Sequence, residues 1–127
     1  MAIEQVLGAT VGSGPAFLVH RLVAAAASTN ATSVRAAPAK VFRVAGVNAA
    51  VTTRYLKLYN KTSAPTVGTD TPRLTIAIPP GAFAHEFSVH GLLLSAGFAY
   101  AITTGPLDSD ATAVADSDIV GLYMLYV

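Results

Sequence analysis

Apolar and polar residues alternate along short stretches of this chain, and each stretch ends at a turn-forming residue before it could form an amphipathic helix. Residues 52–59 show the pattern clearly: the two leucines share one face of an extended strand, and Tyr55, Lys57 and Tyr59 share the other. This period is that of a half-buried β-strand. The chain is therefore predicted to be all-β.

Turn residues separate about eight such segments, and no convincing amphipathic helix interrupts them. The expected strands are residues 18–26, 31–36, 40–47, 52–59, 72–78, 83–89, 91–104 (one or two strands around Gly97) and 119–127. Residues 60–71 and 105–118 are predicted to be long loops. Many short strands with frequent turns predict a single antiparallel β-sandwich or jelly roll over residues 18–127.

The first segment, residues 1–17, is predicted to be an extended N-terminal arm, because glycines and Pro15 interrupt any regular element. At the other end, residues 119–127 are apolar on both faces, which indicates a strand covered on both sides. Such a strand is either central in a sheet or in contact with a neighbour.

Charged residues make up only 12% of the chain, about half of the usual share of about 25%. We infer that copies of the chain or a larger assembly cover much of its surface. A membrane is not expected to do so, because the longest weakly polar stretch, residues 91–102, is too short to span one. The residues predicted to contact partners are Ile3, Val6, Leu7, Val11, Tyr55, Lys57, Tyr59, Tyr123 and Tyr126.

The charges are unevenly placed, although they nearly cancel over the whole chain. Residues 1–63 carry seven Lys and Arg against Glu4, whereas residues 64–127 carry Arg73 against six acids. The basic residues are scattered singly, so nucleic-acid binding is not expected. We expect instead that the basic part of one copy meets the acidic part of the next.

Residues able to carry chemistry are few. The chain has no cysteine, which excludes disulfides, thiol catalysis and Cys-based metal sites. His85 and Ser88 fall on opposite faces of a strand, and no nucleophile, base and orienting group align. We therefore predict that the protein is not an enzyme and holds no cofactor.

An acidic loop is the one candidate metal site, with oxygen ligands from Asp108, Asp110, Asp116 and Asp118. Its spacing does not fit an EF-hand. The preferred interpretation is that these side chains form turns and cap strand ends. The four aspartates are therefore weak candidates for calcium binding.

The central and late segments resemble small β-sandwich structural proteins of tailed bacteriophages and prophages. The motifs that carry the resemblance are KLYNK at 57–61, PTVGTDTP at 65–72 and AITTG at 101–105, in that order. It covers about residues 20–127 and excludes the arm. Because the motifs are strand and turn motifs, they indicate a fold family and bring no catalytic residues.

The resemblance implies a virion component made in the bacterial cytoplasm and assembled into a particle. The function expected first is that of a capsid decoration (cement) protein in the phage head. Its partners would be the major capsid protein and further copies of itself, with a trimer favoured. The alternative is a tail-fibre, spike or receptor-binding module.

Overall fold

Alternating side chains give each strand one apolar face, and these faces pack together between two antiparallel sheets. The computed structural model describes residues 16–127, and all but the last two residues of the arm predicted over residues 1–17 lie outside them. The first sheet has the order β1 (Leu18–Ala24), β9 (Ile119–Tyr126), β3 (Ala39–Asn48) and β6 (Gly81–Glu86), and β7 (Leu92–Leu94) pairs with the start of β3. The second has the order β2 (Thr32–Arg35), β8 (Phe98–Thr103), β4 (Arg54–Asn60) and β5 (Leu74–Ile78).

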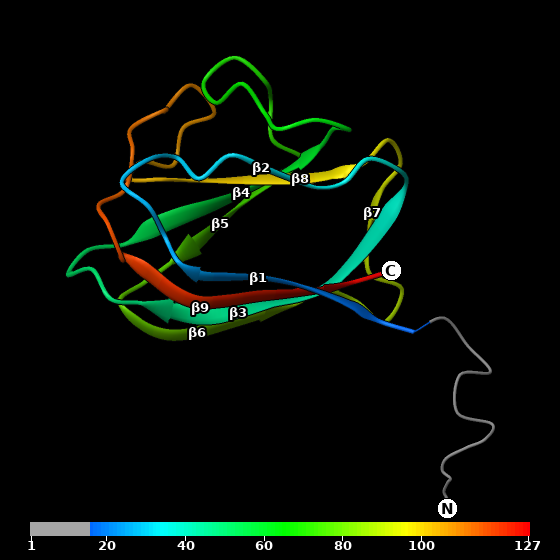
Figure 1. Cartoon of the computed structure of the whole chain (residues 1–127), viewed down its shortest axis with the longest axis horizontal. Coiled ribbons are helices and arrows are strands. Elements are labelled where there is room, and N and C mark those ends of the chain that lie inside the picture. The colour runs from blue at the N-terminus through cyan, green and yellow to red at the C-terminus, as the bar shows by residue number, and fades with distance from the viewer. Residues whose placement is uncertain (1–15) are drawn as a thin grey trace, which may run out of the picture.

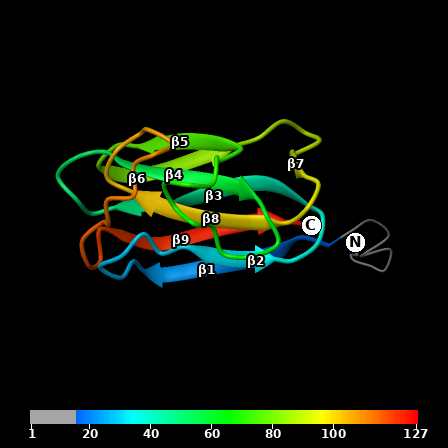
Figure 2. The same ribbon diagram turned by 90° about the horizontal axis from the view of Figure 1, so that it is seen from above.

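The two sheets lie one above the other as a β-sandwich, which confirms the predicted all-β class (Figure 1). Seen from above, β1 and β2 lie at one side of the sandwich, and β5 and β6 lie at the other (Figure 2). The segment 91–104 contains two strands, so the described residues form nine strands in all. No helix occurs in residues 16–127 that could cross a membrane.

The core lies between the sheets and is almost entirely apolar. Leu56 and Leu58 of β4 are fully buried there, as their alternation predicted. Val44, Leu122 and Met124 face them from the first sheet and are equally buried. Since β9 lies between β1 and β3, its backbone is hydrogen-bonded on both sides. The last segment is thus a central strand.

A β-bulge in β9 changes which of its side chains face the core. Ala45 lies opposite Tyr123 and Val47 lies opposite Val120, so Gly121 and Leu122 together oppose one residue of β3. Gly121 has a φ of 60°, which glycine adopts without steric cost. Strict alternation would put Ile119 on the face of Tyr123, but the bulge lets Ile119 join Leu122 in the core.

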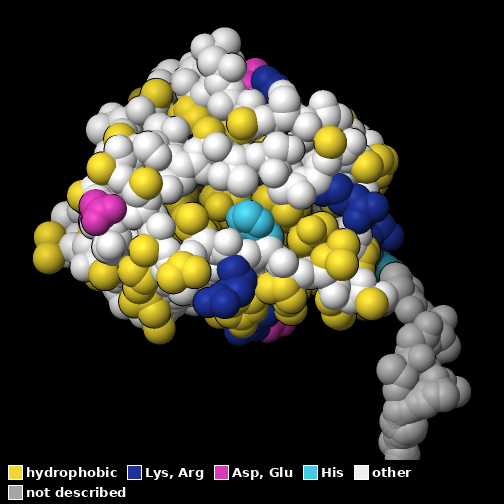
Figure 3. All heavy atoms as spheres, in the orientation of Figure 1, with side chains coloured by type: hydrophobic (Ala, Val, Ile, Leu, Met, Phe, Trp, Pro, Cys, Tyr) yellow, Lys and Arg dark blue, Asp and Glu magenta, His cyan; other side chains and the backbone are white. Residues whose placement is uncertain are grey.

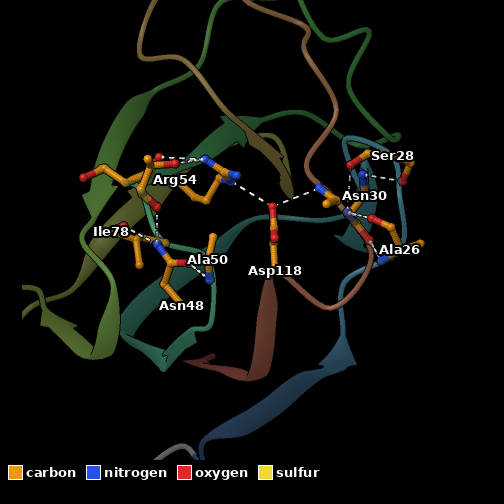
Figure 4. Close-up of polar contacts among 11 residues, drawn as sticks. Ala26, Ser28, Asn30, Asn48, Ala50, Arg54, Ile78 and Asp118 are labelled. Carbon is orange, nitrogen blue, oxygen red and sulfur yellow. Dashed lines mark hydrogen bonds and ion pairs between the residues drawn. The ribbon is translucent and has the colours of Figure 1, made fainter.

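Polar side chains tie together the loops at one end of the sandwich (Figure 4). Asn48, nearly fully buried, donates from Nδ2 to the carbonyl oxygen of Ile78 at 2.8 Å and so joins β3 to β5. Arg54 Nε donates to Asp118 Oδ2 at 2.9 Å, and the same oxygen accepts from the Ala115 amide at 2.9 Å. These contacts hold the start of β9 against the start of β4.

Asp118 is the acidic member of this cluster. Burial alone would raise the pKa of its carboxyl group, but the hydrogen bonds from Arg54 and Ala115 and the Arg54 charge outweigh burial, and the pKa lies below its usual value. A carboxyl whose pKa is lower in the folded state stabilises the fold above its unfolded-state pKa, about 3.9. This stabilisation is lost as the pH falls through the folded-state pKa.

Replacing Asp118 with Asn should lower the free energy of unfolding by about 1.5–3 kcal/mol at pH 7, because a charge-assisted hydrogen bond in a partly buried site is lost. The matched control is Asp116→Asn, an exposed position two residues away, which should change stability by less than about 0.5 kcal/mol. Urea unfolding measures both. The difference in the free energy of unfolding between the two variants should shrink as the pH approaches 3. Equal stability of the two variants at pH 7 would contradict the role assigned to Asp118.

Candidate docking face

The outer faces of the two sheets differ in what covers them. Two long loops, residues 61–73 and 104–118, lie over the second sheet, whereas no loop of the described chain lies below the first (Figure 1). The sandwich therefore has one face closed by its own loops and one face, here called bare, that no loop of residues 16–127 covers.

Small side chains let the loops approach the second sheet closely. Ala99 and Ala101 of β8 are fully buried beside Tyr59, and Val67 of the first loop packs on this cluster. Burial, followed by the charges of Asp70 and Asp108, raises the pKa of the Tyr59 hydroxyl. This side of β4 and β8 is thus a second, smaller core.

Lys57 lies beneath the loop 104–118 with no exposed surface. Its ammonium donates from Nζ to the carbonyl oxygens of Leu107 at 2.6 Å and Asp110 at 2.9 Å. Burial lowers the pKa of Lys57, and the charges of Asp110 and Asp108 oppose that shift. The ammonium therefore anchors the loop through main-chain oxygens.

These positions correct the predicted packing face of Tyr55, Lys57 and Tyr59. All three side chains do point away from the core, but the chain's own loops bury Lys57 and Tyr59, and neither is open to a neighbouring copy. Tyr55 is half-buried. Alternation identified the face correctly but could not show that distant loops fold over it.

The bare face of the first sheet is largely apolar, and we call it the docking face. Strand register places together the residues Val19, Arg21 and Val23 of β1, Tyr123 and Leu125 of β9, Arg43, Ala45 and Val47 of β3, and Ala82, Ala84 and Glu86 of β6. Val23 and Val19 expose 67% and 56% of their surface. In Figure 3 this face forms the lower edge of the molecule, where hydrophobic side chains lie on both sides of a central group of basic and acidic ones.

The charges on the docking face are mostly neutralised within it. Arg43 forms an ion pair with Glu86 and donates from Nε to the Tyr123 hydroxyl at 3.0 Å. Arg21 is exposed and takes part in no ion pair among the described residues. The face thus offers a partner apolar surface and, within residues 16–127, one cation outside any ion pair.

The other residues predicted to contact partners fall in different places. Tyr123 lies on the docking face, but the Tyr126 ring packs edge-on against Phe98 in the core, with ring centroids 5.5 Å apart. Tyr126 is therefore more a core residue than the predicted contact. The arm residues Ile3, Val6, Leu7 and Val11 lie outside the described part of the chain.

The four aspartates of the acidic loop do not converge. A carboxylate oxygen of Asp110 accepts from the Thr112 amide at 2.8 Å, and Asp118 is held by Arg54 and Ala115. Asp108 and Asp116 are exposed. Within residues 16–127, no three His, Asp or Glu side chains gather closely enough to hold a metal ion. Two of the four therefore make turns, as the preferred interpretation had it.

The histidines and Ser88 do not form a catalytic arrangement with one another. His20 Nε2 is 3.0 Å from the hydroxyl of the buried Tyr100, and burial lowers the pKa of this imidazole. His85 stacks edge-on with Phe87. Ser88 has no hydrogen bond to either histidine among the described residues.

Comparison of the chain with protein-family models, with curated proteins and with solved structures finds no match.

Lys57→Met should lower the free energy of unfolding by about 1–3 kcal/mol, because a buried ammonium and its two partly buried hydrogen bonds to carbonyl oxygens are lost. Amide hydrogen exchange over residues 104–114 should become faster at the same time. The matched control is Arg73→Met, an exposed position that should change neither measurement. Unchanged exchange in the Lys57 variant would show that the ammonium does not anchor the loop.

Proposed function

We propose that this chain is a capsid decoration protein of a tailed bacteriophage, which docks on the assembled head through the docking face. The observation that supports this most is the bare apolar sheet, in a chain whose other sheet is closed by its own loops. The resemblance of about residues 20–127 to phage structural proteins points the same way. The partners proposed are the major capsid protein and further copies of this chain.

We propose further that the sandwich is a jelly roll. The supporting observation is the pairing of β1 with β9, β2 with β8, β3 with β6 and β4 with β5, as in one long hairpin folded over on itself. The short strand β7 is an addition at the edge of β3. Jelly rolls recur among viral capsid proteins, which is consistent with the proposed location in the virion.

The mechanism needs no chemistry. A protein that binds the assembled shell and not the separated subunits shifts the equilibrium toward the shell by mass action. Four strands spaced about 4.8 Å apart and seven residues long offer a face of roughly 450 Å². A standard interface buries about 800 Å² on each partner. Each contact through this face would therefore be weak, and many bound copies would act together.

The first test is the copy number of this chain in particles of the phage that encodes it, measured by quantitative mass spectrometry against the major capsid protein. A ratio near that of the capsid protein is expected. A few copies per particle would favour the alternative of a tail-fibre, spike or receptor-binding module. Absence from the particle would overturn both proposals.

Val23→Lys should weaken binding to heads stripped of this protein by at least about tenfold, because a new ammonium would be buried against an apolar partner. The matched control is Val51→Lys, which lies outside the strands, is 93% exposed and should bind as the native protein does. Co-sedimentation measures binding, and thermal unfolding checks that both variants fold. Undiminished binding of Val23→Lys would exclude this face as the head contact.

A further inference from the structure

Beside one end of the docking face lies a shallow, largely apolar cavity of about 220 Å³. Pro38, Ala39, Lys40, Leu93 and Val127 line it. Lys40 lies opposite Leu93 in the pairing of β3 with β7, and its backbone exchanges two hydrogen bonds of 2.9 Å with Val127. The cavity is therefore built on paired strands, next to Leu125 of the docking face.

The size and chemistry of the cavity suit a short peptide segment. Sites for small molecules occupy about 300–1,000 Å³, so this cavity is small for one and large enough for an aliphatic side chain. Its walls are apolar except for Lys40, which is exposed and belongs to none of the three ion pairs within residues 16–127. A fitting occupant has an apolar residue next to a carboxylate.

We propose that residues 3–7 of a neighbouring copy, the segment IEQVL, occupy this cavity. Ile3 would fill the apolar part and Glu4 would pair with the Lys40 ammonium. Glu4 is the single acidic residue in the first 63, where seven basic residues outnumber it. The charge of Lys40 is thus complementary to that of Glu4, which stands directly after the apolar Ile3.

The position of β1 favours a neighbour's segment over the chain's own. Leu18 lies opposite Tyr126, so β1 begins beside the cavity's Val127, and residues 3–7 of the same chain would have to turn back through residues 8–16 to enter it. A neighbour's segment meets no such constraint. A segment of fifteen residues can span up to about 50 Å when extended. A domain of this length has a radius of gyration of about 14 Å, so such a segment is long enough to reach a neighbouring copy.

Such a contact also supplies interface area that the docking face lacks. The roughly 450 Å² of that face is well below the 800 Å² per partner of a standard interface. A segment passed from each copy to the next makes a head-to-tail contact, which can close into a ring such as the proposed trimer. This inference concerns contacts between copies in solution and does not depend on what the docking face binds.

Because the chain has no cysteine, a disulfide can test the contact directly. Glu4→Cys and Lys40→Cys chains are mixed under mild oxidation and separated on a non-reducing gel. The matched control replaces Lys40→Cys with Val51→Cys, which is highly exposed and outside the cavity. We expect the first mixture to give at least about tenfold more mixed dimer than the control. Equal yields would overturn the cavity as the receiving site.

The double variant Glu4→Cys with Lys40→Cys separates the two possible sources of the segment. Links between copies should give a ladder of dimers and larger species, whereas a purely intrachain disulfide would overturn the neighbour's role. Charge reversal gives a second measurement: Glu4→Lys should weaken self-association about tenfold in light scattering, and added Lys40→Glu should restore it. Failure of the second change to restore association would exclude the Glu4–Lys40 pair.

Discussion

The buried ammonium of Lys57 holds one of the two loops that close the outer face of the second sheet. A lysine without exposed surface must have its charge hydrogen-bonded, because an unsatisfied buried cation costs several kcal/mol. Leu107 and Asp110 provide the acceptors, so the loop 104–118 is held over the second sheet. The alanines of β8 give the other loop, 61–73, room to lie close through Val67. The first sheet has no such anchor, and its outer face stays uncovered by the described chain.

Charge pairing within the chain accounts for part of its uneven charge distribution. Each of the three ion pairs in the described residues joins a basic residue of the first 63 to an acidic residue of the rest: Arg43 with Glu86, Arg54 with Asp118, and Lys61 with Asp70. The pattern that predicted contacts between copies is thus used in part to hold one copy together. Arg21 and Lys40 stay outside these pairs, and both lie on or beside the docking face.

Strand positions could be predicted from the sequence because period-two alternation and turn residues are local signals. Every expected strand is present, with ends shifted by a few residues. The covering of Lys57 could not be predicted, because it depends on a loop some fifty residues away in the chain. That of Tyr59 depends on how the loop 61–73 folds back, so that Val67 packs on the cluster of Tyr59, Ala99 and Ala101. The bulge at Gly121 also escaped alternation, since one extra residue reverses the faces on either side of it. The docking face can be identified only when the strand register and the positions of the covering loops are both known.

The low charge of the chain and the small area of its open face both favour a function in which many copies act together. A face of roughly 450 Å² gives a weak contact for a single copy, and an apolar surface with few charges gives little selectivity of its own. Both deficits are reduced when copies are linked, because a second contact then forms within one assembly at a high effective concentration. A cavity suited to a neighbour's segment would provide that link beside the face that it strengthens. Under the two proposals, weak docking and self-association would be two parts of one binding mechanism.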